Sequence, residues 1–196
     1  MELEEEKSRN LFVYNNIMVN NLNLIIRNKD FGLEKVDFTE NFRTRLASRG
    51  IVFDPKTKKI AMVVKTKINE YKLPGGGREG EETEEETFYR EIFEETGCKV
   101  KIVEKLGTIL EERENIDMKQ ISTIFVSELI EDTKELHPTK KEIDEGLTVE
   151  WMEVGAALEA VRNSFELVLG DDYEDLYNAR FVLKRDLAIL EYYIKH

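Results

Sequence analysis

The sequence predicts one α+β domain in which short strands and longer helices pack around a common core. Runs of β-branched and aromatic residues occur along the chain, separated by turn-forming residues, as strands require. Elsewhere apolar residues recur every three to four positions, which is the spacing of an amphipathic helix. The 196 residues are enough for one domain with a substantial core.

The N-terminal half predicts several strands in order. Residues 1–42 are interpreted as an N-terminal extension. Within it, Leu11–Val19 and Leu22–Arg27 are apolar enough for short strands or for packed extensions, a choice that the residues leave open. Ala47–Asp54 and Ile60–Lys65 are β-branched runs joined by a turn, so they predict a hairpin.

A loop and a helix follow the hairpin. Lys72–Gly77 (KLPGGG) is expected to be a loop, because proline and three consecutive glycines disfavour regular elements. Thr83 and Glu86 form a T-x-x-E capping box at the start of a helix, and Gly97 is a typical left-handed stop. We therefore expect a helix from about Glu84 to Thr96.

The rest of the chain predicts further strands and two helices. The expected strands are Val100–Leu110, Ile121–Leu129 and Leu147–Met152. Two helices are expected: Val154–Ser164 begins the first, and Tyr173–Ile194 forms the second, which closes the chain. The last helix has an apolar stripe, so we expect residues 171–196 to pack on the domain formed by residues 43–170 or on the partner in a homodimer.

The charge balance narrows the classes of function. The net charge is −12, from 41 acidic and 29 basic residues. Proteins that bind nucleic acid gain most of their affinity from basic surfaces, so this balance argues against nucleic acid as a partner. It argues equally against an anionic membrane surface. A small polyanion remains compatible with the composition if a metal ion supplies positive charge.

The sequence also predicts a cytoplasmic protein that does not act at a membrane. Cys98 is the only cysteine, so it excludes an internal disulfide and a thiolate metal cluster. The first ten residues, MELEEEKSRN, are acidic and lack the basic-then-apolar order of a signal peptide. No apolar run approaches the ~20 residues that a membrane span requires.

Three carboxylates crowd one face near the end of the predicted 84–96 helix. Glu91, Glu94 and Glu95 are spaced i, i+3 and i+4, so their side chains are neighbours on a helix. Like charges at this spacing repel, and the negative end of the helix dipole also disfavours acids. Divalent cations such as Mg²⁺ prefer carboxylate and carbonyl oxygen, and binding one would remove the repulsion.

The segment around these acids resembles the Nudix box, G-x5-E-x7-R-E-U-x-E-E-x-G-U, in which U is apolar. Every fixed letter is present at the required spacing, as Gly76, Glu82, Arg90, Glu91, Glu94, Glu95 and Gly97. The final apolar position is Cys98, which behaves as a small hydrophobe. Seven fixed letters arise by chance in about one chain in a million. The chain is therefore identified as a member of the Nudix hydrolase family.

The resemblance implies an α/β/α sandwich with a mixed sheet and a Mg²⁺-dependent reaction, with Mn²⁺ as an alternative ion. Its substrate would be a nucleoside diphosphate derivative whose diphosphate bridge is cleaved. By resemblance, the metal ligands are the three carboxylates and a backbone carbonyl, from Glu91, Glu94, Glu95 and Gly76. Glu94 also counts among the catalytic residues, together with Glu82 and Arg90, which are expected to brace the loop against the helix.

Members of the family often recruit one further acid from a loop ahead of a strand that bears a tryptophan. Here that loop is HPTKKEIDEG, before Trp151. Glu145 is the first choice for this acid and Glu142 the second, as a general base or an additional ligand. Arg45, Arg49 and Lys72 are assigned to the phosphates of the substrate.

The sequence leaves the substrate open. Gly107–Asp117 carries neither the proline nor the tyrosine that marks subgroups of the family, so a nucleoside triphosphate is the default expectation. A catalytically silent nucleotide-binding module is the alternative, although such members usually lose box glutamates and this chain retains them. Processing of RNA 5′ ends fits the same box but agrees poorly with the net charge of −12.

Overall fold

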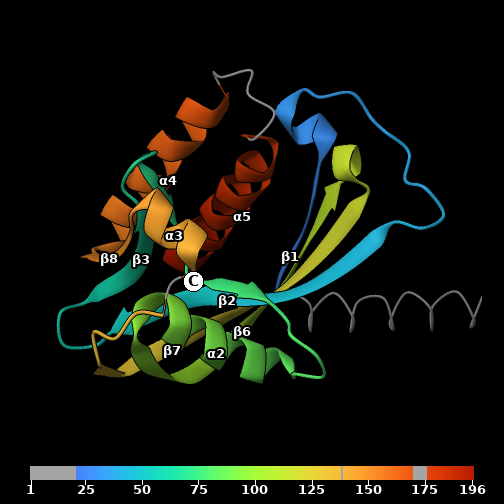
Figure 1. Cartoon of the computed structure of the whole chain (residues 1–196). Coiled ribbons are helices and arrows are strands. Elements are labelled where there is room, and N and C mark those ends of the chain that lie inside the picture. The colour runs from blue at the N-terminus through green and yellow to red at the C-terminus, as the bar shows by residue number, and fades with distance from the viewer. Residues whose placement is uncertain (1–20, 138, 170–175) are drawn as a thin grey trace, which may run out of the picture.

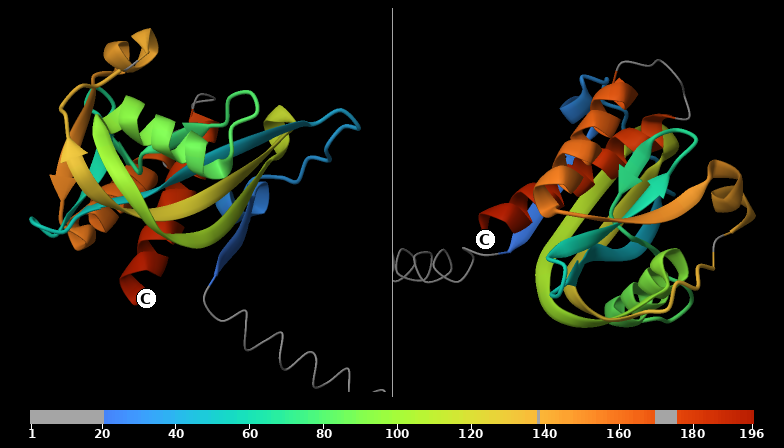
Figure 2. Two further views of the ribbon diagram at one scale, coloured as in Figure 1. Left: turned by 90° about the horizontal axis from the view of Figure 1, so that it is seen from below. Right: turned by 90° about the vertical axis from the view of Figure 1, so that its left-hand side faces the viewer.

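The structure is a computed structural model that describes residues 21–137, 139–169 and 176–196. Its centre is an eight-stranded mixed sheet with the order β1-β6-β7-β2-β3-β4, to which β5 adds by pairing with β2 and β8 by pairing with β3. Helix α2 covers one face of the sheet, and α4 and α5 lie on the other (Figure 1). The two turned views show the same three layers (Figure 2). The α/β/α sandwich predicted from the sequence is therefore confirmed.

The elements have the following bounds. The strands are β1 (Leu22–Arg27), β2 (Arg43–Asp54), β3 (Lys59–Lys65), β4 (Glu70–Lys72), β5 (Gly75–Gly77), β6 (Cys98–Arg113), β7 (Met118–Asp132) and β8 (Leu147–Met152). The helices are α2 (Glu84–Thr96), α3 (Lys140–Glu145), α4 (Val154–Leu169) and α5 (Leu176–Lys195), with short 3-10 helices at Asn28–Phe31 and Glu114–Ile116.

The sheet contains two parallel strand pairs, and its other pairs are antiparallel. β1 runs parallel to β6, from Leu22 beside Gly107 to Arg27 beside Glu112. β6 and β7 are antiparallel, and β7 is parallel to β2. Leu22–Arg27 is thus a strand that extends the sheet, which decides the alternative that the sequence left open. Leu11–Val19 lies outside the described residues.

Each face of the sheet has its own apolar core. The larger core lies between the sheet and the α4–α5 pair and includes Ile26, Ile51, Met62, Ile109, Phe181, Leu187 and Leu190. The smaller core lies under α2 and includes Val52, Ala61, Phe88, Ile92, Cys98, Val100 and Phe125. The residues of α5 that form its apolar stripe pack within the larger core of this chain.

Several element predictions are confirmed. The helix α2 has the predicted bounds, and the hairpin forms with Phe53 opposite Ile60. The strands β6 and β7 extend beyond the predicted ranges, because they form one long antiparallel hairpin whose pairing runs from Cys98 with Asp132 to Arg113 with Met118.

Two predicted loops contain regular structure. Gly75–Gly77 was expected in a loop but forms β5, antiparallel to Ala47–Arg49 of β2. The physical reason is close approach, since a Cβ added at Gly75 would lie only 2.3 Å from the Cβ of Arg49. The second loop, HPTKKEIDEG, contains α3 (Lys140–Glu145), which places Glu145 at a helix end.

None of the helices in the described residues is both long enough and apolar enough to cross a membrane.

Candidate active site

The helix α2 is fixed at both ends by the signals that the sequence carries. The Thr83 hydroxyl oxygen accepts a hydrogen bond from the Glu86 backbone N–H at 3.1 Å, and the Glu86 carboxylate accepts one from the Thr83 backbone N–H at 2.8 Å. Gly97 ends the helix at φ +67°, a left-handed conformation. Because Phe88 and Ile92 are buried in the core below, the face that bears Glu91 and Glu95 is turned toward β5.

The glycine at position 76 is required by this packing. A Cβ added there would lie 2.3 Å from a carboxylate oxygen of Glu91, well inside van der Waals contact. The Glu91 carboxylate therefore lies directly against the backbone of β5. Any larger residue at position 76 would displace that carboxylate.

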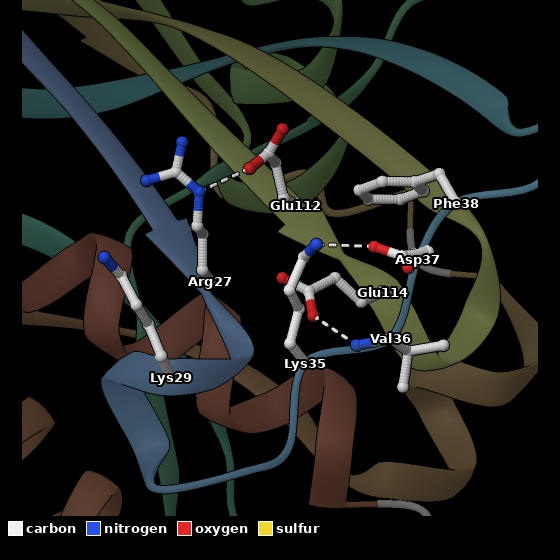
Figure 3. A pocket seen from close by; sticks show the side chains of 8 residues that line it. All are labelled: Arg27, Lys29, Lys35, Val36, Asp37, Phe38, Glu112 and Glu114. Carbon is white, nitrogen blue, oxygen red and sulfur yellow. Dashed lines mark hydrogen bonds and ion pairs between the residues drawn. The ribbon is translucent and has the colours of Figure 1, made fainter.

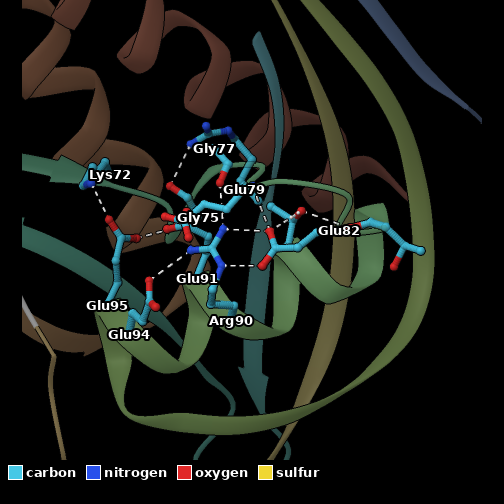
Figure 4. Close-up of polar contacts among 12 residues, drawn as sticks. Lys72, Gly75, Gly77, Glu79, Glu82, Arg90, Glu91, Glu94 and Glu95 are labelled. Carbon is cyan, nitrogen blue, oxygen red and sulfur yellow. Dashed lines mark hydrogen bonds and ion pairs between the residues drawn. The ribbon is translucent and has the colours of Figure 1, made fainter.

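Arg90 joins the turn after β5 to α2 (Figure 4). Its guanidinium donates to both carboxylate oxygens of Glu82, at 2.7 and 3.0 Å, and to the Gly77 carbonyl oxygen at 2.8 Å. These hydrogen bonds, together with one from the Glu79 backbone N–H, lower the pKa of Glu82 to about 2. The Arg90–Glu82 pair thus holds the end of β5 and the helix in a fixed relation.

The three clustered acids accept from basic side chains (Figure 4). We call Glu91, Glu94 and Glu95 the acidic cluster. Arg90 donates to Glu91 at 3.0 Å and to Glu94 at 3.1 Å. Glu95 accepts from Lys72 at 2.7 Å and from the Gly75 backbone N–H at 2.8 Å. Burial, followed by the proximity of Glu95 and Glu94, raises the pKa of Glu91.

The acidic cluster has the chemistry of a divalent-metal site but not yet its arrangement. In the described part of the chain, no three His, Cys, Asp or Glu side chains converge closely enough to hold an ion. The carboxylates form ion pairs with Arg90 and Lys72 instead. The donor set still fits a hard cation, since it offers carboxylate oxygens from adjacent turns of one helix beside a glycine backbone. Metal binding would replace the contacts to Arg90 and Lys72.

A cavity of about 260 Å³ lies beside β5, and we call it the glycine-strand cavity. One side carries Glu91 and Glu95 of α2 together with Lys72, and the glycines 75–77 also line it. The other side carries guanidinium groups from β2, β6 and α5. These are Arg45, Arg49, Arg113 and Arg185, which we call the basic wall.

A second cavity, of about 400 Å³, lies at the end of β1, and we call it the β1 cavity (Figure 3). Its charged side chains include two ion pairs, between Arg27 and Glu112 and between Lys35 and Asp37, each at 2.5 Å. Glu114 accepts from the Val36 backbone N–H at 2.9 Å. Four of the six charged side chains that line the β1 cavity are thus held in two ion pairs.

Residues 43–169 match the family model of the NUDIX domain. The chain belongs to the Nudix family. A solved NUDIX hydrolase from Nitrosomonas europaea has a similar fold, with a TM-score of 0.56 and 13% sequence identity over 78% of this chain and 90% of that one. At that identity the likeness shows the fold alone. A search of the curated proteins finds no significant match.

Membership in the Nudix family confirms what the box predicted, a hydrolase that acts on phosphoric anhydrides. Nudix hydrolases act on small-molecule nucleotide derivatives and generally use divalent metal cations.

In this Nudix chain the residues expected to bind substrate lie beside the box. Arg45, Arg49 and Lys72 all line the glycine-strand cavity. Glu145 does not line it. Its carboxylate forms an ion pair with Lys65 at 3.1 Å, at the end of α3. The side chain of Glu142 lies outside what the structure describes.

The glycine-strand cavity is also lined by residues that the sequence did not reveal, namely Arg113, Gln120, Val182 and Arg185. Arg185 lies on the last helix, to which the sequence assigned only packing. One feature of the sequence indicates a specific role for Arg185. Arg185 and Asp186 are charged neighbours between Leu183 and Leu187, inside an apolar stripe, and charged residues are rarely buried without a specific partner.

Proposed function

We propose that this protein is a Mg²⁺-dependent pyrophosphohydrolase that cleaves the diphosphate bridge of a nucleoside diphosphate derivative. A nucleoside triphosphate is the first substrate to test, and Mn²⁺ is an alternative ion. The observation that carries the proposal is that Glu91 and Glu95 of the acidic cluster lie beside three consecutive glycines in a cavity whose opposite side is basic. Carboxylates suit the metal, and glycines and arginines suit phosphate.

Within this proposal, Glu91, Glu94, Glu95 and the Gly76 carbonyl oxygen hold the ion. When bound, a divalent cation supplies charge neutralisation for the phosphates and lowers the pKa of a coordinated water. The side chains and backbone of the protein provide the positioning. Arg90 and Glu82 keep α2 in position against β5, and the glycines leave room for a phosphate near the backbone.

The structure favours Glu94 over Glu145 as the group that accepts the proton from the attacking water. Glu94 has the most exposed side chain of the acidic cluster, at 43% against 14% for Glu91 and 8% for Glu95. It contacts Arg90 at 3.1 Å, so it belongs to the same hydrogen-bonded group as Glu91. Glu145 would first have to leave Lys65.

A substrate panel tests the proposal. Purified protein is incubated with Mg²⁺ or Mn²⁺ and with nucleoside triphosphates, dinucleotides, nucleotide sugars or capped RNA, and the products are separated by chromatography. We expect release of a nucleoside monophosphate from at least one small-molecule substrate, and loss of that activity in EDTA. Tight nucleotide binding by calorimetry without turnover of any substrate would instead support the catalytically silent alternative.

Two further expectations belong to this proposal. We propose a cytoplasmic location, because the single cysteine, Cys98, suits a reducing compartment. We also propose that a homodimer is the assembly to test, by sedimentation at several protein concentrations. A sedimentation coefficient that corresponds to a monomer throughout would contradict the second expectation.

A further inference from the structure

The basic wall contains guanidinium groups that are almost inaccessible to solvent. Arg49 of β2, Arg113 of β6 and Arg185 of α5 are 4%, 5% and 1% exposed. Arginine is rarely buried to this extent unless it is paired, because removing a charge from water costs several kcal/mol. The neighbours of these three side chains therefore show whether their positive charge is balanced within the protein.

Two buried carboxylates balance part of the charge. Glu111 accepts from Arg113 at 2.9 Å, from Arg185 at 3.4 Å and from the Gln120 amide at 2.5 Å. Asp186 accepts from the Arg185 Nε at 2.8 Å. Although burial opposes it, the nearby Arg185, Arg113 and Arg49 lower the pKa of Glu111 to about 2.

These two carboxylates do not balance all of the positive charge of the basic wall. On the basic wall itself, four guanidinium groups, those of Arg45, Arg49, Arg113 and Arg185, lie with the two carboxylates of Glu111 and Asp186, so this wall carries two more positive than negative charges. On the opposite side of the cavity, Glu91 and Glu95 are paired with Arg90 and Lys72. Two buried donor atoms, the Nη2 of Arg185 and the Nε of Arg113, have no hydrogen-bond partner among the described residues. Leaving a buried charged donor unsatisfied is costly, so a structural network would be expected to pair them.

The electrostatic consequence appears on the neighbouring arginines. Burial and then the charge of Arg185 lower the pKa of Arg49 to about 9, which still leaves it protonated at pH 7. Burial and then the charge of Arg113 lower the pKa of Arg45. Burial is the larger cause of both shifts and a neighbouring arginine the second, so an anion bound in the cavity would oppose both shifts by stabilising the charged guanidinium groups.

We propose that the basic wall is a subsite for a terminal phosphate group of the substrate, with Arg185 of α5 as its central donor. A phosphomonoester carries −1.5 to −2 charges at pH 7 and three acceptor oxygens, which matches two excess charges and two free donors. Guanidinium groups bind such oxygens in a fixed fork geometry. Arg185 lies outside residues 43–169, so the subsite depends on a helix beyond the matched domain.

The terminal-phosphate subsite specifies a class of substrate. It rests on the proposed function only for which bond of the phosphate chain is hydrolysed. A nucleoside triphosphate, or another derivative whose phosphate chain ends in a free phosphate group, fills the subsite. A nucleotide sugar or a dinucleotide with a two-phosphate bridge has both ends of that bridge capped, so it leaves the two charges of the basic wall unbalanced.

Phosphate binding without metal tests the subsite independently of catalysis. Calorimetry in EDTA measures the affinity for inorganic phosphate and tripolyphosphate in the wild type, Arg185→Met, Arg185→Lys and Arg162→Met. Arg162 is the matched control, because it pairs with Glu159 and Glu191 on the surface of α4–α5. We expect saturable binding that Arg185→Met weakens by about tenfold or more, Arg185→Lys weakens less, and Arg162→Met leaves unchanged.

Thermal unfolding shows whether each variant is folded. If Arg185→Met does not fold, Arg45→Met replaces it, because Arg45 is less buried and contributes one hydrogen bond, to Gln120. Absence of phosphate binding by the wild type in EDTA overturns the subsite, as does binding of wild-type strength by folded Arg185→Met or, where that variant is unfolded, by Arg45→Met.

Activity separates the subsite from the proposed function. In the presence of Mg²⁺, Arg185→Met should lower kcat/KM for a nucleoside triphosphate by about tenfold or more and change it little for a nucleotide sugar. An equal loss for both substrates overturns the assignment to a terminal phosphate. If no substrate is hydrolysed at all, the proposed function fails, while the phosphate titrations still decide the subsite.

Discussion

In the glycine-strand cavity three of the four arginines, Arg49, Arg113 and Arg185, are nearly inaccessible to solvent, whereas in the β1 cavity the Lys35 and Asp37 side chains are 78% and 85% exposed. The β1 cavity is the larger, at about 400 Å³ against about 260 Å³. Four of its six charged side chains form two ion pairs, while the glycine-strand cavity retains buried donors without partners among the described residues. Incomplete pairing of buried charge, rather than volume, therefore distinguishes the cavity that we propose binds a charged ligand.

Neighbouring residues of β6 illustrate the same contrast. Glu111 is fully buried in the basic wall, and Glu112 lines the β1 cavity, where it pairs with Arg27. Successive residues of a strand point to opposite faces, so one strand serves both cavities. The two acids differ in position by one residue, yet they lie in entirely different electrostatic environments.

The largest expected effect concerns catalysis in the glycine-strand cavity. Glu94→Gln should lower kcat by about 10²- to 10⁴-fold, because it removes a carboxylate assigned to metal binding and proton transfer. Steady-state kinetics with saturating Mg²⁺ measure this effect. Glu85→Gln, on the exposed first turn of the same helix, is the control and should retain wild-type activity. Unchanged turnover in Glu94→Gln would exclude that residue from both roles.

The paired acids of β6 provide the second prediction, which concerns stability. Glu111→Gln should lower the free energy of unfolding by about 3 kcal/mol or more, because it leaves buried arginines without their counter-charge. Glu112→Gln should lower it by less than about 1 kcal/mol, since the pair with Arg27 is partly exposed. Urea unfolding of both variants measures the difference. Equal effects would contradict the distinction drawn between the two cavities.

The third prediction is a pH dependence that follows from Glu111. Its folded-state pKa, about 2, lies below the ordinary value of 4.5, so the folded state favours the ionised form. The resulting stability is fully present above about pH 4.5 and is lost as the pH falls toward 2. Urea midpoints between pH 6 and 2.5 should fall more steeply for the wild type than for Glu111→Gln. Parallel curves would show that Glu111 contributes nothing to acid denaturation.

The smallest effect is expected in the β1 cavity. Lys35→Ala removes one member of an exposed ion pair, so the free energy of unfolding measured in urea should not differ detectably from that of the wild type. The value of kcat/KM should stay within about twofold of the wild type. A larger loss of activity would show that the β1 cavity contributes to substrate binding, and the contrast between the cavities would fail.

The two sides of the glycine-strand cavity were not equally predictable from the sequence. The acidic cluster lies on one helix, with spacing that is visible in a single segment and caps that fix its bounds, so Glu91, Glu94 and Glu95 could be found together. The basic wall draws on β2, β6 and α5, which are far apart in the chain. Only the strand pairing and the packing of α5 bring Arg113 and Arg185 to Arg49.

The errors in the fold prediction have a related cause. The three glycines of β5 have a strong local preference for irregular structure, and the sequence does not show the close contact with Arg49 that requires a glycine at position 75. The assignment of α5 to packing alone followed from its apolar stripe. The stripe is real, but Arg185 and Asp186 within it are held by Glu111 and by the Leu73 backbone N–H, which are distant in sequence.

The position of β1 and α5 outside residues 43–169 bears on how the gene can be shortened. A fragment cut at those boundaries would lack Ile26, Phe181 and Leu190, all fully or almost fully buried, and would expose an unpaired edge of β6. We expect such a fragment to aggregate on expression. Useful recombinant versions must therefore retain both flanking segments.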